Sequence, residues 1–257
     1  CLVGSEMCIR DGDVTAYKTY TENQLFSPEI STTTGYSKLY VNAGKVTNKG
    51  IELALGFKQN IGPVDWKTTL LWSLNRNRID QLLPEYTNEE LGVTVHLDEM
   101  DVYSLGGAKQ RLTVGGSMGA VYVNTMRTDE HGHIWMNSMT GTLETDKNNY
   151  VYAGNTNPKY TLSWRNEFNW KGISLGFMLN ARVGGIGVSA TQAVMDYYGV
   201  SKTSAEARDN GGVKVNGQMI DAQTWYQTIG ANGTGYVGSM YVYSLSLIHI
   251  SEPTRHA

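Results

Sequence analysis

The stretch Tyr160–Val183, YTLSWRNEFNWKGISLGFMLNARV, decides the fold of this chain. A two-residue turn at Lys171–Gly172 folds its halves together antiparallel, and one face of the pair is then almost wholly apolar. The facing pairs on that side are Trp170–Ile173, Phe168–Leu175, Asn166–Phe177, Trp164–Leu179 and Tyr160–Val183. The other face carries polar, small and charged residues. Alternation over about ten residues on each side of a Lys-Gly turn predicts a β-hairpin with one apolar face.

Such a hairpin fits a soluble sandwich, with the apolar face inward, or a transmembrane β-barrel, with that face toward lipid. Aromatic residues lie at both ends of the hairpin: Phe168 and Trp170 near the turn, and Tyr160 at the far end. A strand that rises about 3.3 Å per residue and tilts by about 40° spans about 25 Å over this length, which matches the lipid-facing band of a barrel. Aromatic residues at both edges are typical of interfacial girdles.

The stretch 49–75 repeats the pattern. Two alternating runs, 49–59 and 64–75, flank a short break at 60–63. Pairing that keeps the apolar faces together predicts these cross-strand neighbours: Phe57–Trp66, Leu53–Leu70 and Ile51–Trp72. Aromatic residues again flank a tight turn.

The remaining sequence predicts further strands at Asp13–Glu22 and Tyr236–Ser244, and shorter strands within Arg111–Val123 and Asn149–Tyr152. The expected connections alternate between long and short: Asn23–Asn48, Asn60–Pro63, Arg76–Lys159, Lys171–Gly172 and Gly184–Gly235. Outer-membrane barrels have short periplasmic turns and long extracellular loops, whereas a sandwich gives no reason for this alternation. The expected fold is therefore all-β, with about six strands of a transmembrane antiparallel barrel.

Both ends of the chain resemble the translation of a sequencing-library adaptor. An oligonucleotide that can encode Leu245–Arg255 has a reverse complement that encodes Leu2–Asp11 in another frame. We therefore expect residues 1–11 and 245–257 to be adaptor-derived artefacts, and residues 12–244 to be an open-ended barrel fragment. Both cysteines, Cys1 and Cys8, lie in the first artefact, so we expect no disulfide, thiol nucleophile or Cys-ligated metal.

Composition agrees with a β-rich chain that carries long polar loops. The 257 residues include 29 Gly, 16 Tyr and 6 Trp, and the mean hydropathy is −0.33. The formal net charge of −3 gives no indication of a nucleic-acid partner. No apolar run reaches the length of about eighteen residues that a membrane helix needs, but barrel strands are only half apolar.

Two segments resemble the SusC/RagA family of TonB-linked outer membrane proteins. One is Val41–Gly56, VNAGKVTNKGIELALG, with the strand that ends in NRNRI; the other is Tyr152–Gly185, which contains Gly154–Pro158 and Gly184–Gly185. The resemblance extends over most of Gly12–Ser244. It implies the C-terminal part of a plugged barrel of about 22 strands in a Gram-negative type outer membrane. The plug, the TonB-interacting segment and the closing strands are expected to lie outside this fragment.

The resemblance also implies a function and partners. Members of the family import oligosaccharides or peptides, with a SusD-like surface lipoprotein as a lid and the TonB complex as the energy source. Outer-membrane lipid and the oligosaccharide or peptide solute are the other expected partners, and no nucleic acid is expected. We expect nutrient import rather than catalysis, and the alternative is a soluble or surface-exposed β-sandwich that serves as a binding or adhesin domain.

The barrel interpretation gives each strand face a role. The residues expected to face lipid are Ile51, Leu53, Leu55, Phe57, Trp66, Leu70, Trp72, Leu74, Tyr160, Leu162, Trp164, Phe168, Trp170, Ile173, Leu175, Phe177 and Leu179. Those expected to face the lumen are Glu52, Lys67, Arg165, Glu167, Asn180 and Arg182. The lumen set forms a wall of mixed charge, whose simplest role is to pair across neighbouring strands.

The long connections are rich in aromatic residues. Flat rings with a polar edge suit stacking on sugars or packing against a partner lid, and packing within their own loops is the alternative. The candidate ligand contacts are Tyr103, Trp135, Tyr197, Tyr198, Trp225 and Tyr226.

No motif indicates a catalytic residue, a cofactor or a metal centre. The segment Asp129–His133 is the best metal candidate, because histidines two apart share one face of a strand, but a solvated turn is the simpler interpretation. Asp98, Glu99 and Asp101 lack the spacing of a calcium-binding EF-hand, and Gly115–Gly119 lacks the features of a phosphate loop. We identify neither a Ser-His-Asp set nor the paired carboxylates of a glycosidase.

Overall fold

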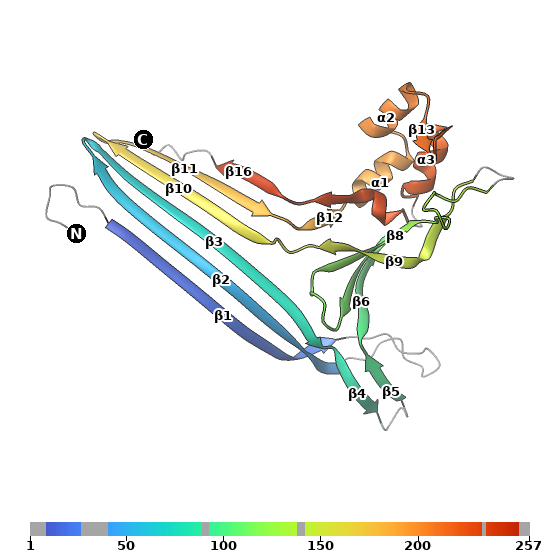
Figure 1. Cartoon of the computed structure of the whole chain (residues 1–257), viewed down its shortest axis with the longest axis horizontal. Helices are drawn as coiled ribbons and strands as arrows, with labels where there is room; N and C mark the ends of the chain where they lie inside the picture. The colour runs from blue at the N-terminus through green and yellow to red at the C-terminus, as the bar shows by residue number, and fades with distance from the viewer. Residues whose placement is uncertain (1–8, 27–40, 89–92, 138–141, 233–234, 252–257) are drawn as a thin grey trace.

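The structure is a computed structural model that describes residues 9–26, 41–88, 93–137, 142–232 and 235–251. It is all-β in class, and its largest element is a six-stranded sheet with the order β1-β2-β3-β10-β11-β16, in which all pairs are antiparallel (Figure 1). The strands are β1 (Ile9–Phe26), β2 (Val41–Ile61), β3 (Val64–Gln81), β10 (Tyr160–Trp170), β11 (Ile173–Val183) and β16 (Leu247–Ser251). Within the described residues the sheet is open, with β1 and β16 at its edges.

Strands β10 and β11 form the hairpin that the sequence predicts. All five predicted facing pairs are confirmed, from Tyr160–Val183 to Trp170–Ile173. The turn residues Lys171 and Gly172 have φ values of 45° and 86°. Positive φ at both positions is what a two-residue turn needs to match the twist of its strands.

Strands β2 and β3 form the second hairpin, but the predicted register is wrong by two residues. Phe57 lies opposite Thr68, and Leu53 lies opposite Trp72. The turn is the cause: it contains only Gly62 and Pro63, so pairing begins at Ile61–Val64. Gly62 has φ of 58°, which glycine adopts without steric cost. A shift of two residues leaves every side chain on its predicted face.

The strand expected at Tyr236–Ser244 is not part of the large sheet. Its residues form the short helix η2 (Gly238–Tyr241) and β15 (Val242–Ser244), and β15 pairs with β12 (Ile186–Val188). Packing is the cause, because Tyr241 is fully buried in a separate core. Strand β16 lies beside β11 instead and consists of residues that we expect to be adaptor-derived. An unpaired strand edge is a template for any extended segment.

The long connections are shorter or more folded than the sequence predicts. Strands β1 and β2 both extend into the expected loop 23–48. The connection 76–159 continues β3 and then forms a hairpin and a four-stranded sheet: β4 (Leu83–Asn88), β5 (Val93–Leu97), β6 (Glu99–Leu105), β7 (Ala108–Thr113), β8 (Ala120–Met126) and β9 (Thr145–Asn155). The expected short strands near 111–123 and 149–152 thus correspond to parts of β7, β8 and β9.

The connection 184–235 contains three helices that the sequence analysis missed. These are α1 (Ala190–Tyr197), α2 (Lys202–Asp209) and α3 (Ala222–Ile229), and the hairpin of β13 (Val213–Val215) and β14 (Gln218–Ile220) lies between α2 and α3. The side chains of Ser189, Ser201 and Asp221 cap the three helix N-termini. We call the β6–β9 sheet together with residues 184–244 the loop domain. It lies at the end of the large sheet that is opposite the two short turns (Figure 1).

The main buried core belongs to the loop domain rather than to the large sheet. Helices α1 and α3 contribute Ala193, Trp225 and Ile229, which pack with Tyr236 and Tyr241. A second cluster connects the large sheet to the loop domain, and its members are Val46, Ile79, Leu82 and Leu112. Among the described residues, no helix is both long and apolar enough to cross a membrane.

Replacement of Gly50 by Ala tests the packing of β1 on β2. A Cβ atom at Gly50 would lie 2.2 Å from Cζ of Tyr17. We expect Gly50→Ala to lower the free energy of unfolding of the chain in detergent micelles by about 1 kcal/mol, because the Tyr17 ring must rotate off the backbone that it covers. Urea unfolding followed by tryptophan fluorescence measures this change.

The control is Gly56→Ala in the same strand, where the new Cβ would lie 3.6 Å from Cβ of Asp11, an ordinary contact. Adding Tyr17→Ala should remove most of the loss caused by Gly50→Ala. An equal loss with and without the Tyr17 ring would contradict the described packing.

Candidate functional site

The two faces of the large sheet have opposite chemistry. Register places all the residues that we expect to face lipid on one face, where Leu53, Trp72 and Leu162 form one cross-strand row. Ile173 and Leu175 on this face remain 64% and 53% exposed. Among the described residues, none of the three buried clusters includes any of the residues expected to face lipid. We call this surface the apolar face.

Two polar side chains within the apolar face accept hydrogen bonds from its indoles. Trp66 Nε1 donates a hydrogen bond to Asn166 Oδ1 at 3.2 Å, and Trp164 Nε1 donates to Thr68 Oγ1 at 2.9 Å. Polar groups in an apolar medium are costly without such partners. These two bonds satisfy both indole N–H groups, whereas the buried Nδ2 of Asn166 has no hydrogen-bond partner. Alternation alone did not predict these contacts.

The opposite face carries the residues that we expect to line a lumen. Arg165 forms an ion pair with Glu167, and Lys67 lies opposite Glu167 on β3. These three residues line a shallow cavity of about 180 Å³. Ser163 Oγ donates to Asn180 Oδ1 at 2.7 Å. This face is thus of mixed charge, but its Arg165–Glu167 ion pair lies within β10, whereas the Ser163–Asn180 hydrogen bond crosses to β11.

Glu52 and Arg182 complete this face. Glu52 lies opposite Ser73, and Ser73 lies opposite Thr161 on the next strand. Arg182 Nη2 donates to the backbone oxygen of Thr156 at 2.8 Å, so this side chain holds the segment that enters β10.

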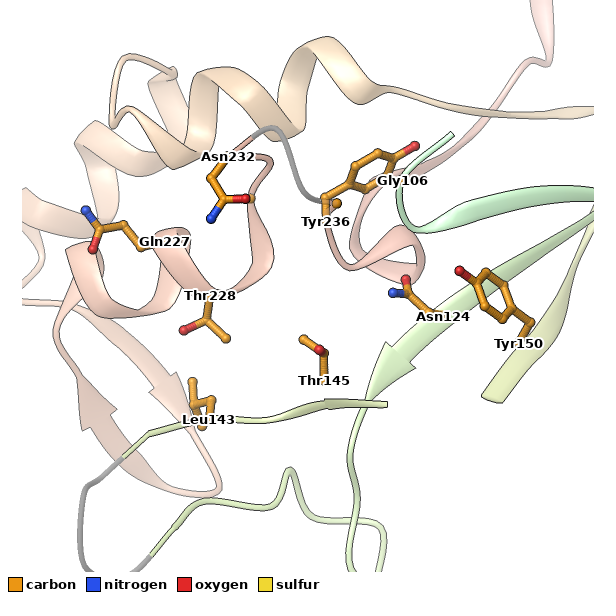
Figure 2. Close-up of a pocket in the computed structure, with 11 residues that line it drawn as sticks. Gly106, Asn124, Leu143, Thr145, Tyr150, Gln227, Thr228, Asn232 and Tyr236 are labelled. Carbon is orange, nitrogen blue, oxygen red and sulfur yellow. The ribbon is translucent and has the colours of Figure 1, made fainter. Parts of the chain in front are cut away.

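A larger hollow of about 400 Å³ lies in the loop domain, between β8, β9 and α3 (Figure 2). Its polar side chains come from several elements, and they are Asn124, Thr145, Tyr150, Gln227, Thr228 and Asn232. None of them carries a formal charge at neutral pH. The volume falls in the range of small-molecule sites, about 300–1,000 Å³. Hydroxyl and amide groups of this kind can bind uncharged polar groups through hydrogen bonds.

The aromatic residues proposed as ligand contacts do not line this hollow, which is lined by Tyr150 and Tyr236 instead. Trp225 was wrong as a candidate, because it is 8% exposed and lies in the loop-domain core. Tyr226 packs against the same core, and burial raises the pKa of its hydroxyl.

The other aromatic candidates are accessible, and two of them lie together. Tyr197 and Tyr198 contact each other edge to face at 5.2 Å, and Tyr198 is 68% exposed. Tyr103 is 58% exposed on β6. The guanidinium of Arg127 lies 4.6 Å from the ring centre of Trp135. Tyr197 and Tyr198 line a cavity of about 140 Å³ together with Tyr226. Tyr103 and Trp135 lie outside this cavity, and all five residues remain candidate contacts.

The segment Asp129–His133 forms a hydrogen-bonded turn. Asp129 Oδ1 accepts from the backbone N–H groups of His131 at 2.9 Å and His133 at 2.8 Å. The bond from the His133 N–H contributes most to lowering the pKa of Asp129. Across the described ranges, no three His, Cys, Asp or Glu side chains gather in a way that could hold a metal ion.

Glu99 and Asp101 pair with cations of the neighbouring strand, whereas Asp98 lies 3.3 Å from Nε2 of His96. Asp101 accepts from Arg111 Nε at 2.7 Å and from Lys109 Nζ at 3.1 Å. Glu99 lies 3.5 Å from Arg111. These ion pairs join β6 to β7.

The glycine-rich segment Gly115–Gly119 fastens the loop domain to the large sheet. Asn77 Oδ1 accepts from Ser117 Oγ at 2.6 Å and from the Met118 N–H at 2.9 Å. Asn155 Nδ2 donates to Ser117 Oγ at 2.7 Å. The segment therefore joins the end of β3 to the end of β9, a role that no sequence motif indicated.

Comparisons with known proteins identify the fold but no family. No protein family and no curated protein matches the sequence. Among solved structures, a RagAB peptide transporter matches with a TM-score of 0.57 and 16% identity over 84% of this chain and 25% of that chain. The RagAB peptide importer in its closed-closed state matches with a TM-score of 0.54 and 15% identity over 94% of this chain and 26% of that one. This chain therefore spans about a quarter of the length of either transporter chain.

Replacement of Asn77 by Ala tests the fastening of the loop domain. The change leaves Ser117 Oγ and the Met118 N–H without their acceptor. We expect faster cleavage of residues 105–120 in limited proteolysis and a free energy of unfolding lower by about 1–3 kcal/mol. Asn75→Ala, two positions away on the same face, is the control. Equal cleavage of both variants and of the unaltered chain would contradict this role of Asn77.

Asp101 predicts a pH dependence of the β6–β7 pairing. Burial raises the pKa of Asp101, but hydrogen bonds from Arg111 and Lys109 lower it by more, so it lies below its usual value. A lowered carboxyl pKa contributes stability above the unfolded pKa of about 4, and this stability is lost as the pH falls through the folded value. Hydrogen-exchange protection of the β6 and β7 amides should therefore fall below about pH 4. In Asp101→Asn, the β6 and β7 amides should already show lower protection than in the unaltered chain at neutral pH. If protection in the unaltered chain were the same below about pH 4 as at pH 6, the role of Asp101 would be refuted.

Proposed function

We propose that this chain is part of the barrel wall and external loops of an outer-membrane transporter that imports a nutrient. The apolar face carries the proposal. It is continuous across β2, β3, β10 and β11, and large side chains such as Ile173 are left exposed. Apolar area removed from water contributes about 25 cal/mol per Å², so a medium that covers this face stabilises the sheet substantially.

A lipid bilayer suits this face better than a second protein layer. Aromatic residues lie near both ends of β10, and the strand between them has the length of a lipid-facing band, about 25 Å when tilted. The alternative β-sandwich needs a second sheet on the apolar face. In the described part of the chain, the loop domain instead packs at the strand ends (Figure 1).

The connections between strands indicate which end of the sheet faces outward in the proposed barrel. The turns at Gly62–Pro63 and Lys171–Gly172 lie at one end of the sheet, and the folded loop domain lies at the other (Figure 1). Barrels of the outer membrane have short turns on the periplasmic side and long loops outside. In our proposal, the loop domain therefore meets the solute first, and the polar face of the sheet lines its passage.

The proposed solute is an oligosaccharide or a peptide. The uncharged hollow beside Tyr150 suits sugar hydroxyls and peptide amides, which exchange hydrogen bonds with neutral side chains. The structures that share the fold are described as peptide transporters, which favours a peptide. The family resemblance adds a SusD-like lipoprotein lid, a plug and the TonB complex to the proposal, and it assigns neither catalysis nor a cofactor to this chain.

Tryptophan quenching tests the membrane placement. Trp66, Trp72, Trp164 and Trp170 belong to the apolar face, whereas Trp135 and Trp225 belong to the external connections. In vesicles that contain brominated phosphatidylcholine, the double variant Trp135→Phe/Trp225→Phe should lose most of its fluorescence. The converse variant, which retains only Trp135 and Trp225, is the matched control and should remain unquenched. An unquenched apolar face would overturn the proposal.

A further inference from the structure

A row of three cations crosses the apolar face at the end nearest the loop domain. Lys18 lies opposite Lys49, and Lys49 lies opposite Arg76, so the row joins β1, β2 and β3. The next pair on this face toward the turns is Ile51–Leu74. Because side chains alternate between faces, the three cations share the face of these apolar residues. We call Lys18, Lys49 and Arg76 the cationic row.

The cationic row has no counter-charge in the described part of the chain. Its three side chains are exposed, and no ion pair includes them. The nearby carboxylates are engaged elsewhere: Glu22 pairs with Lys45 at 2.8 Å, and Asp80 lies 3.8 Å from Arg78. Like charges directly opposite each other destabilise a sheet. An anion bound across the row would remove this repulsion.

The position of the cationic row along the strands indicates where this anion comes from. From Ile51 to Ile61, strand β2 covers about 33 Å, or about 25 Å along the membrane normal at a tilt of about 40°, which is the height of the lipid-facing band. The row lies two residue pairs beyond Ile51–Leu74, so it is placed just outside the hydrocarbon. Lipid phosphate groups occupy this depth, and long cationic side chains extend toward them.

We propose that the cationic row binds the phosphate of an anionic lipid headgroup in the leaflet on the loop-domain side. The proposal rests on the proposed function, because the row meets a headgroup only if the apolar face lies in a membrane. The guanidinium of Arg76 provides a planar fork for two phosphate oxygens, and the two ammonium groups add point charges. The row thus gives the barrel wall a preference for a class of lipid.

The opposite face contains a matched pair of lysines. Lys58 lies opposite Lys67, but Glu167 lies on the other side of Lys67. Like Lys49 and Arg76, these two cations face each other across β2 and β3, but they have a carboxylate beside them. It therefore serves as a control for removing two positive charges from the sheet.

The test compares two brominated lipids at equal mole fraction in vesicles that contain the full chain. Trp72 is the reporter, because it lies on β3 near Arg76, and the other tryptophans are replaced by Phe. We expect brominated phosphatidic acid to quench Trp72 about threefold more strongly than brominated phosphatidylcholine. In Lys49→Gln/Arg76→Gln, the two lipids should quench Trp72 equally. In the control Lys58→Gln/Lys67→Gln, the stronger quenching by phosphatidic acid should remain. Inorganic phosphate in the buffer should leave the preference unchanged.

Equal, strong quenching by both lipids in the unaltered chain would overturn this inference and leave the proposed function standing. A preference that survives Lys49→Gln/Arg76→Gln would also overturn it. Loss of the preference in inorganic phosphate would show that the row binds a free anion rather than a headgroup. No quenching of Trp72 by either lipid would instead count against the membrane placement and hence against the proposed function.

Discussion

Backbone pairing between long antiparallel strands is the constraint on which this structure depends. Each strand places alternate side chains on opposite faces, so the register of one hairpin fixes which residues can share a surface. The β10–β11 ladder sets this division, and β3 extends it because Trp164 lies opposite both Leu179 and Leu70. Two chemically different surfaces follow, one apolar and one charged.

The alternating pattern was sufficient to predict the four central strands of the large sheet, β2, β3, β10 and β11. Both bounds of β10 and β11 and their register follow from period-two alternation around a Lys-Gly turn. The β2–β3 register was wrong because alternation does not distinguish shifts of two residues, and the turn length decides between them. Gly62 and Pro63 form a two-residue turn, and a turn of this length fixes the observed register.

The loop domain could not be predicted in the same way. Its helices are each eight residues long, and their stability comes from caps and from contacts with residues far away in the sequence. Tyr241 reads as part of an alternating strand, yet burial against α1 and α3 decides its conformation. The hollow beside Tyr150 is built from β8, β9 and α3, so no local motif could indicate it. Asn77 likewise gains its role only when Ser117 lies beside it.

The central claim is that the apolar face contacts lipid while the opposite face contacts water. Spin labels on single cysteines at successive positions 51–58 of β2, with Cys1 and Cys8 replaced by Ser, test it most directly. In a bilayer, we expect accessibility to oxygen to be highest at the odd positions, such as Leu53 and Leu55, and accessibility to a water-soluble nickel complex to be highest at the even positions. Nickel accessibility that is equal on both faces, or highest at the odd positions, would contradict the account.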